Sequence, residues 1–301
     1  MKRQQTLKRV TSVSGVGVHT GKPATVVLSP APANSGIVFM RSDFTGGEPR
    51  IPAHGDYVCA TELGTTLRNA SGAEIATIEH LMAACAGLGV DNLIVAVDGP
   101  ELPILDGSAA PFVELLLEAG LKSQAAPRRR IRIKERIAVQ VGTKSAALEP
   151  CAQPEFDVTI RFRDASIGTQ RRAFVNSPET FLDEIAQART FGFLADVDRL
   201  HAAGRGRGAS LDNTVVIDAG RVVNPEGVRF EDEFVRHKIL DAIGDLALAG
   251  GPILGRYVAD QPGHALNAAL VRALLNAPQA WAWDVETETV EFDEPAQAAV
   301  A

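Results

Sequence analysis

Cysteine is scarce in this chain of 301 residues. The three cysteines stand far apart, and no Cys-x-x-Cys pair occurs. An odd number of isolated cysteines supports neither a disulfide framework nor a thiolate zinc cluster, so the sequence indicates a reducing compartment. Hydrophobic residues, by contrast, make up 46% of the chain. This content excludes long disorder and is enough for a substantial core, within one large domain or two smaller ones.

Long hydrophobic runs are also missing. The basic start, MKRQQTLKR, is not followed by an apolar stretch, and no run approaches the roughly 20 apolar residues that a membrane-spanning helix needs. We therefore expect a soluble, cytoplasmic protein without a stable membrane anchor. The chain also has no excess of basic residues: it contains 30 Lys and Arg and 37 Asp and Glu, for a net charge of −7. A nucleic-acid-binding surface is therefore not expected.

Two patterned regions flank a polar, basic segment at Lys122–Arg130 (KSQAAPRRR). Such a segment is typical of a linker, although a solvated turn within one domain would have the same composition. Each region opens with strand-like alternation and continues with helix-like periodicity. This repeated order predicts an α+β fold built from a duplicated unit. We place the domains at residues 1–124 and 125–290, and we expect a disordered tail at 291–301.

Each half is expected to contain a helix, a short apolar strand and a second helix, in that order. The expected helices are 77–86 and 111–119 in the first half and 231–249 and 264–275 in the second, with strands at 92–97 and 252–258. Thr77 is the expected N-cap of the first helix. A duplicated unit places equivalent helices in equivalent positions. His80 and His237 are therefore expected to meet at one interface.

The helix expected at 231–249 has two distinct faces at 100° per residue. Its apolar face consists of Val235, Ile239, Ile243 and Leu246. On roughly the opposite side, His237, Asp241 and Asp245 follow one another at intervals of one turn. An imidazole and a carboxylate at this spacing can hold one metal ion. Most such stripes are simply solvated, but His and Asp are poor helix formers, and a functional role explains their presence.

A catalytic zinc ion usually takes three protein ligands, so a third ligand must come from elsewhere. His80 is the strongest candidate, because Glu79 beside it puts a carboxylate where it can accept a proton from water. A capping or surface role is the alternative for this pair. His264 begins the last helix and needs a nearby carboxylate such as Asp245 to act as an acid. An ordinary histidine of a first helical turn is the alternative there.

Six runs of sequence together resemble the UDP-3-O-acyl-N-acetylglucosamine deacetylases, the zinc amidases of lipid A biosynthesis in Gram-negative bacteria. The runs are SGVGVHTG (14–21), TIEHLMAACAGLGVDN (77–92), PILDGSAAPFVELL (103–116), ARTFGF (188–193), RFEDEFVRHKILDAIGDL (229–246) and GHALN (263–267). They occur in order over nearly the whole chain. The resemblance implies two similar α+β domains, each with a small insert, whose helical layers face each other in a β-α-α-β sandwich.

The resemblance also implies a metal-dependent amidohydrolase with its site between the two domains. The implied metal ligands are His80, His237 and Asp241. Zinc is the implied metal, and Fe²⁺ is an alternative for this ligand set. Glu79 is implied as the general base, His264 as the general acid and Asp245 as the partner that orients His264.

Substrate contacts follow from the same resemblance. Thr190 is implied to stabilise the oxyanion, and Lys238 and Phe191 to contact the polar part of the substrate. An insert at about 191–214, which includes Phe193, is implied to line an apolar passage for the acyl chain. Within it, the two arginines of GRGRG stand where apolar residues are more usual.

The implied reaction is hydrolysis of the N-acetyl group of UDP-3-O-acyl-N-acetylglucosamine to the free amine and acetate, the committed step of lipid A biosynthesis. Two alternatives stay open at this point. One is a related zinc amidase that acts on another acetylated substrate, and the other is a non-catalytic protein that binds a sugar nucleotide or lipid. We expect a monomer whose contact with the membrane is at most transient.

Overall fold

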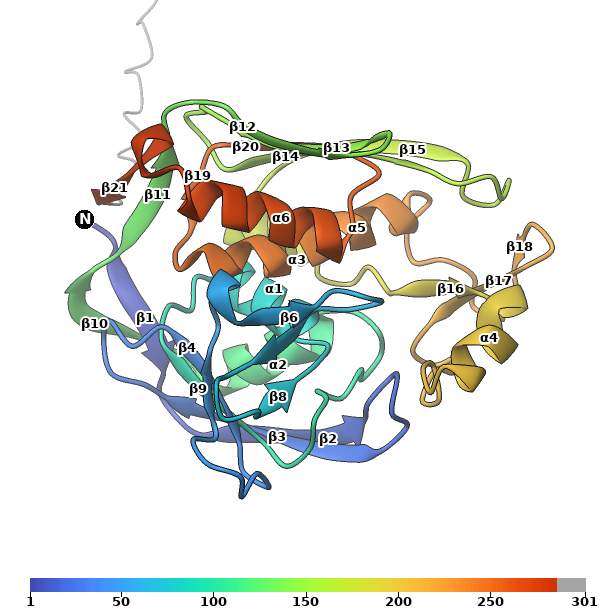
Figure 1. Ribbon diagram of the computed structural model, residues 1–301, viewed down its shortest axis with the longest axis horizontal. Helices are drawn as coiled ribbons and strands as arrows, with labels where there is room; N and C mark the ends of the chain where they lie inside the picture. Colours follow the sequence, from blue (N-terminus) through green and yellow to red (C-terminus); the bar gives the residue numbers. More distant parts are fainter. Residues whose placement is uncertain (286–301) are drawn as a thin grey trace, which may run out of the picture.

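Two five-stranded sheets form the outer layers of the molecule, and helices lie between them (Figure 1). The computed structural model describes residues 1–285, so the tail expected at 291–301 lies outside the described residues. Buried apolar side chains from both halves of the chain join into one core cluster. The α+β class expected from the sequence is confirmed.

The two large sheets share one topology. The first has the order β2 (Thr11–Val16), β3 (Pro23–Pro30), β9 (Leu93–Val97), β4 (Ile37–Arg41), β5 (Arg50–Pro52). The second has the order β12 (Ile137–Val141), β13 (Lys144–Glu149), β20 (Arg256–Asp260), β14 (Glu155–Arg161), β15 (Thr169–Val175). In each sheet the third and fourth strands pair in parallel, and the other neighbours are antiparallel. This repetition agrees with the duplicated unit expected from the sequence.

The inner layers consist of two helices from each half (Figure 1). They are α1 (Glu79–Leu88) and α2 (Ala110–Ala119) from the first half, and α5 (Glu233–Leu246) and α6 (His264–Leu275) from the second. α1 packs against α5, which brings equivalent helices of the two halves together. Every residue of α5 except Arg236 and Lys238 is buried. The polar stripe on this helix is therefore not a solvated face.

Smaller sheets complete each half. One joins β6 (Val58–Ala60), β7 (Thr66–Arg68) and β8 (Glu74–Ile75), and another joins β16 (Phe191–Phe193), β17 (Val215–Asp218) and β18 (Arg221–Val222). Two short helices, α3 (Pro178–Glu184) and α4 (Val197–Ala202), lie in the second half. The insert expected at about 191–214 contains β16 and α4, and β17 follows it directly.

The segment expected as a linker is mostly a strand. Residues Leu121–Pro127 form β10, which pairs antiparallel with β1 (Arg3–Leu7). The next strand, β11 (Arg129–Ile133), pairs with β19 (Ile253–Leu254) and β21 (Trp281–Val285). A partner more than 100 residues away in sequence supplies the hydrogen bonds, which composition alone does not reveal. The boundary between the halves stays a prediction.

Some expected element ends were wrong. Thr77 does not cap α1, because its backbone has a φ of 59° and its hydroxyl donates to the Glu101 carboxylate instead. The helix ends at Leu88 and is capped by Gly89, with a φ of 75°, rather than ending at residue 86. The strand expected at 252–258 is divided at Gly255 into β19 and β20. Among the described residues, every helix is too short or too polar to cross a membrane.

Candidate active site

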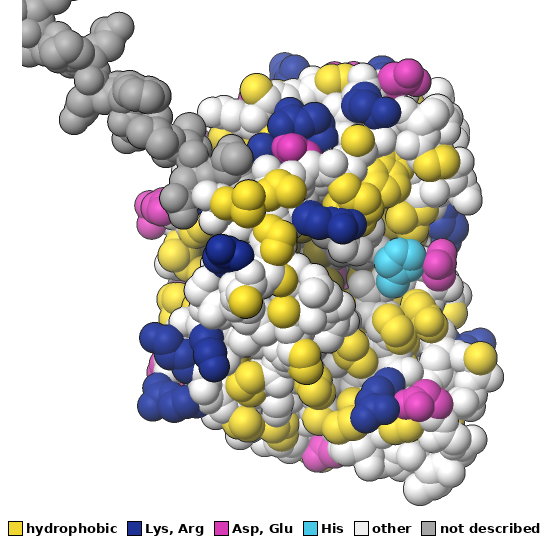
Figure 2. Space-filling model, turned by 90° about the vertical axis from the view of Figure 1, so that its left-hand side faces the viewer, with side chains coloured by type: hydrophobic (Ala, Val, Ile, Leu, Met, Phe, Trp, Pro, Cys, Tyr) yellow, Lys and Arg dark blue, Asp and Glu magenta, His cyan; other side chains and the backbone are white. Residues whose placement is uncertain are grey.

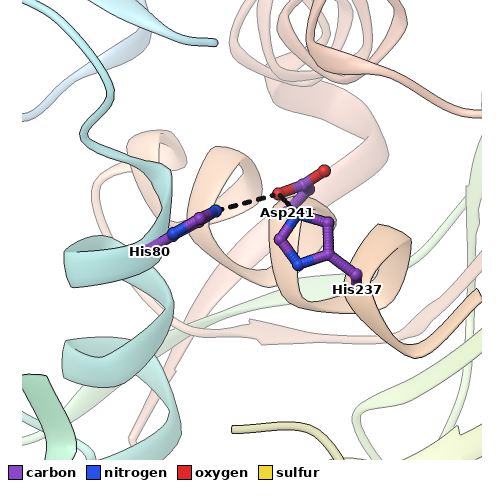
Figure 3. A group of neighbouring side chains, drawn as sticks. All are labelled: His80, His237 and Asp241. Carbon is purple, nitrogen blue, oxygen red and sulfur yellow. Dashed lines mark ion pairs between the residues drawn. The ribbon is translucent and has the colours of Figure 1, made fainter. Parts of the chain in front are cut away.

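Three buried side chains with metal-ligating atoms meet between α1 and α5 (Figure 3). His80 points from α1 toward His237 and Asp241, which lie one turn apart on α5. One candidate ligand atom from each residue lies within 4.8 Å of the other two. The sequence-predicted ligand set is therefore brought together, and the contact between α1 and α5 is what does so.

Two of the distances between these atoms are close to those in a tetrahedral metal site. Oδ1 of Asp241 lies 3.3 Å from Nε2 of His237 and 3.7 Å from Nε2 of His80. Metal–ligand bonds of about 2.0–2.1 Å in a tetrahedron put ligand atoms about 3.3 Å apart. Within residues 1–285, Oδ1 of Asp241 is buried and receives no hydrogen bond. A buried carboxylate oxygen without a donor is costly, and a bound divalent cation would satisfy it.

Neighbouring groups orient these candidate ligands. Nδ1 of His237 donates to the backbone carbonyl of Ala188 at 3.0 Å, which leaves Nε2 free to ligate. Nζ of Lys238 donates to Oδ2 of Asp241 at 2.7 Å, so Oδ1 is the oxygen that stays available to a metal ion. Burial lowers the pKa of His237 to about 3, so its imidazole is neutral. Burial opposes ionisation of Asp241, yet the pKa of this carboxyl is well below its usual range, and the Lys238 ammonium that donates to Oδ2 contributes to this shift.

Glu79 lies next to this centre at the start of α1 and is 3% exposed. Burial raises the pKa of Glu79, and the nearby His264 and His80 oppose that shift. One carboxylate oxygen, Oε2, accepts a hydrogen bond from the backbone N–H of Thr65 at 3.0 Å. The other, Oε1, lies 3.9 Å from Nε2 of His264. A buried carboxylate with a raised pKa and one open oxygen is suited to accept a proton.

His264 and Asp245 form a hydrogen-bonded pair beside Glu79. Nδ1 of His264 donates to Oδ2 of Asp245 at 2.9 Å, and Nε2 points toward Glu79 and Asp241. Burial lowers the pKa of His264, but the carboxylates of Asp245 and Glu79 outweigh it and raise the pKa to about 10. The imidazole is therefore protonated at neutral pH, as a general acid requires.

Three residues that sequence reasoning missed support this pair. Thr65 donates its hydroxyl to Oδ1 of Asp245 at 2.6 Å, and the Asn267 side-chain amide donates to Oδ2 at 2.9 Å. Tyr257 in turn donates its hydroxyl to Asn267 at 2.6 Å. Asn267 follows His264 by three residues in the run GHALN, and this helical spacing is a signal that could have found it. Thr65 and Tyr257 have no such local signal.

The segment 188–193 lies along the other side of the centre. The Phe191 ring is 6.3 Å from the His237 ring, and Nζ of Lys238 lies 5.4 Å above Phe191. Thr190 lies in sequence between Phe191 and Ala188, whose carbonyl accepts from His237, and its own backbone N–H donates to the carbonyl of Gly107 at 2.8 Å. Phe193 packs against Phe162, with ring centroids 6.0 Å apart.

A buried ion pair anchors this segment. Glu233, in the first turn of α5, is fully buried and accepts hydrogen bonds from the backbone N–H and the guanidinium of Arg189 at 2.9 and 3.0 Å. Its second oxygen accepts from the backbone N–H of Arg229 at 2.6 Å. Sequence reasoning missed both residues of the pair. Because Arg189 precedes Thr190, the pair holds the segment against the helix that carries His237.

The glycine- and arginine-rich part of the insert contacts the first half of the chain. The backbone N–H of Arg207 donates to the carbonyl of His19 at 3.2 Å, and that of Gly208 donates to the carbonyl of Val18 at 3.0 Å. A Cβ on Gly208 would lie 2.3 Å from the carbonyl oxygen of Gly17, so only glycine allows this approach. The loop therefore joins the two halves.

A separate cavity of about 1090 Å³ opens between the halves on the face shown in Figure 2, which is hollowed there. The facing helices α1 and α5 both contribute to its lining, for example through Met82 of α1 and Ile243 of α5. The three candidate metal ligands are not among the described residues that line it. The candidate site is therefore assigned from its chemistry, not from cavity size.

Comparison with known proteins agrees with this chemistry. The family model described as UDP-3-O-acyl N-acetylglycosamine deacetylase matches residues 4–276. The chain belongs to this deacetylase family. All the catalytic and metal-site candidates described above fall within the matched residues.

Curated relatives of the deacetylase family cover nearly all of the chain. A UDP-3-O-acyl-N-acetylglucosamine deacetylase from Phenylobacterium zucineum is 52% identical over 92% of this chain and 95% of its own length. Proteins of the same name from Actinobacillus pleuropneumoniae serotype 3 and from a Shewanella species are each 46% identical, over 99% of this chain and 96% of their own.

Proposed function

We propose that this chain hydrolyses the N-acetyl group of UDP-3-O-acyl-N-acetylglucosamine to the free amine and acetate, the committed step of lipid A biosynthesis. One observation carries the proposal beyond family membership. A buried ligand set, His80, His237 and Asp241, lies beside both a carboxylate base and a protonated imidazole. A protein that only binds a sugar nucleotide or lipid has no need of this combination.

We propose that His80, His237 and Asp241 hold Zn²⁺, with Fe²⁺ as the other metal suited to this ligand set. The open oxygen of Asp241 and its distances to His237 and His80 support this assignment. When bound, the metal supplies a Lewis acid that polarises the amide carbonyl and makes water more acidic. The remaining steps belong to side chains of this chain.

Glu79 is the proposed general base. Its Oε2 is held by the backbone N–H of Thr65, so Oε1 is the oxygen that accepts the proton of the attacking water. The water oxygen then bonds to the acetyl carbonyl carbon, and negative charge develops on the carbonyl oxygen. Thr190 is proposed to donate a hydrogen bond to this oxyanion, because its segment lies along the site.

His264 is the proposed general acid. Its Nδ1–H is held by Asp245, so Nε2–H is the donor that faces Glu79 and the centre. As the carbon–nitrogen bond of the amide breaks, the sugar nitrogen takes this proton and leaves as an amine. Acetic acid and the free amine are then the products, and the acid ionises to acetate by losing its proton to solvent. The proton that Glu79 took from water passes to the neighbouring His264, so both groups return to their starting states.

The substrate contacts stay proposals. Lys238 and Phe191 are proposed to contact the polar part of the substrate, since both lie beside the ligand set. Phe193 and the insert at about 191–214 are proposed to line the passage for the acyl chain. Domains at 1–124 and 125–290, a monomeric state, a cytoplasmic location and transient membrane contact likewise stay predictions from the sequence.

Mass spectrometry of the reaction product tests the proposed function. The purified protein is incubated with UDP-3-O-acyl-N-acetylglucosamine, with and without a chelator, and the expected result is a metal-dependent loss of one acetyl group. An unchanged substrate mass in the presence of metal would overturn the proposal. The same acylated sugar without UDP serves as the control, and equal turnover of both would favour an amidase for another acetylated substrate.

A further inference from the structure

Thr65 contacts the proposed base and the carboxylate that orients the proposed acid. It precedes β7 in the first half of the chain and is 1% exposed. Its backbone N–H donates to Oε2 of Glu79 at 3.0 Å, and its hydroxyl donates to Oδ1 of Asp245 at 2.6 Å. Glu79 belongs to the first half and Asp245 to the second. One residue therefore ties the proposed base to the partner of the proposed acid.

The bond to Asp245 determines which way that carboxylate faces. Oδ1 accepts the Thr65 hydroxyl, while Oδ2 accepts Nδ1–H of His264 and the amide of Asn267. With donors on both oxygens, rotation of the carboxyl group would break at least one hydrogen bond. Because Asp245 is 2% exposed, water does not readily replace a lost donor. The hydroxyl thus keeps Oδ2 directed at His264.

The bond to Glu79 has a matching effect on the base. A donor on Oε2 turns Oε1 toward Nε2 of His264, 3.9 Å away. Gly64, just before Thr65, leaves the space that Oε1 occupies, because a Cβ there would lie 3.0 Å from this atom. The backbone at 64–65 therefore orients the carboxylate without depending on the Thr65 side chain.

We propose that Thr65 is a positioning residue that aligns the base and the acid through separate bonds, its backbone holding Glu79 and its hydroxyl holding Asp245. The proposal rests on the proposed function, since it takes the roles of Glu79 and His264 from there. It makes a specific prediction. Loss of the hydroxyl impairs proton donation through His264, while the backbone bond to Glu79 and the metal ligands stay in place.

Three variants test the role of the hydroxyl. Thr65→Val keeps the shape and the backbone N–H but loses the hydroxyl, and Thr65→Ser keeps the hydroxyl. We expect Thr65→Val to lower kcat about 10- to 100-fold, with KM and metal content within about twofold of wild type. Thr65→Ser is expected to recover most of this loss, and the neighbouring Thr66→Val to behave as wild type. Equal kcat in Thr65→Val and Thr65→Ser would overturn the proposal.

A double-variant cycle shows whether Thr65 acts through Asp245. In an Asp245→Asn background the hydroxyl has no carboxylate to orient, so adding Thr65→Val is expected to change kcat by less than about twofold. A full 10- to 100-fold loss in that background would mean that Thr65 acts elsewhere, and would overturn the proposal.

A spectroscopic measurement separates failure of this inference from failure of the proposed function. In metal-free protein with ¹⁵N-labelled histidine, the Nδ1–H resonance of His264 reports its hydrogen bond to Asp245. We expect Thr65→Val to shift it and Thr65→Ser to leave it near the wild-type position. An unmoved resonance in Thr65→Val would overturn the positioning role even if wild-type protein releases acetate. A wild-type protein that releases none would overturn the function alone.

Discussion

Gly244 of α5 lies against the backbone carbonyl oxygen of Glu79, the first residue of α1. A Cβ on Gly244 would lie 2.0 Å from that oxygen. Glycine inside a helix costs about 1 kcal/mol relative to alanine, so helix propensity does not account for its presence. Its absence of a side chain lets α1 approach α5 closely, and this approach brings His80 to His237 and Asp241.

Substitution of Gly244 by alanine tests this packing. Because the new methyl group meets backbone rather than a flexible side chain, we expect Gly244→Ala to push the helices apart and to destabilise the protein by about 1–3 kcal/mol. Metal affinity falls with it, since His80 moves away from its partners. Gly99→Ala is the control, because its Cβ meets only ordinary contacts, the nearest at 3.6 Å. Equal stability and metal affinity in both variants would contradict this account.

Glu79→Ala separates the base from the ligands. We expect this variant to keep its metal and to lose about 10²- to 10⁴-fold in kcat, because a positioned base contributes a factor of this size. Metal analysis and steady-state kinetics on one preparation provide the measurement. Glu114→Ala, at an exposed position of α2, is the matched control. Loss of metal from Glu79→Ala would show that Glu79 is a ligand.

Asp241→Ala removes the carboxylate whose Oδ1 receives no hydrogen bond among the described residues. We expect metal affinity to fall by more than about 100-fold, beyond the loss seen for residues that only orient a ligand. Competition with a chromophoric chelator measures this affinity. Asp245→Asn, one turn further along α5, is expected to keep near-wild-type affinity. Unchanged affinity in Asp241→Ala would rule out the helix stripe as a metal site.

Asp245→Asn is expected to change the pH dependence of catalysis. In wild type, burial lowers the pKa of His264, but the Asp245 and Glu79 carboxylates raise it to about 10. The acid form is therefore present at neutral pH, and kcat falls as pH rises through this pKa. Removal of the Asp245 charge lowers the pKa, so the alkaline limb of the kcat profile moves to lower pH. An alkaline limb at the wild-type position would contradict the assigned partnership.

The same pKa has a consequence for stability. The pKa of His264 is higher in the folded protein than the 6.5 of a free imidazole. The protonated His264 therefore contributes its full stabilisation of the folded state below about pH 6.5, and this contribution is lost as pH rises toward about 10. We expect the free energy of unfolding of wild type to fall across this range more steeply than that of Asp245→Asn, as urea unfolding at several pH values measures.

Much of the site was predictable from local sequence. The spacing of His237 and Asp241 is a property of the helix, whose 3.6 residues per turn place positions four apart on one face. The last helix begins at His264, as expected from the sequence, and the repeated order of strands and helices indicated the duplication. Each of these signals lies within a few residues, where backbone geometry is the same in any α-helix.

Other features had no local signal. A polar stripe has the same period whether solvent or protein covers it, so the burial of Asp241 depended on the packing of α1 against α5. Thr77 is of a residue type that often caps helices, yet its hydroxyl donates to Glu101. That carboxylate lies 24 residues away in sequence and is brought to Thr77 by the fold. Thr65 reaches Asp245 across 180 residues of sequence.

Local sequence was thus sufficient to predict the spacing of His237 and Asp241 along their helix and the α+β class of the chain. The folded arrangement was needed to show that the polar stripe on α5 is buried and that a segment resembling a linker pairs as a strand. It was also needed to show that Thr65 binds both Glu79 and Asp245. The reason is physical. Helix spacing is set by the backbone over a single turn, whereas burial and hydrogen bonding between distant segments depend on how whole layers pack.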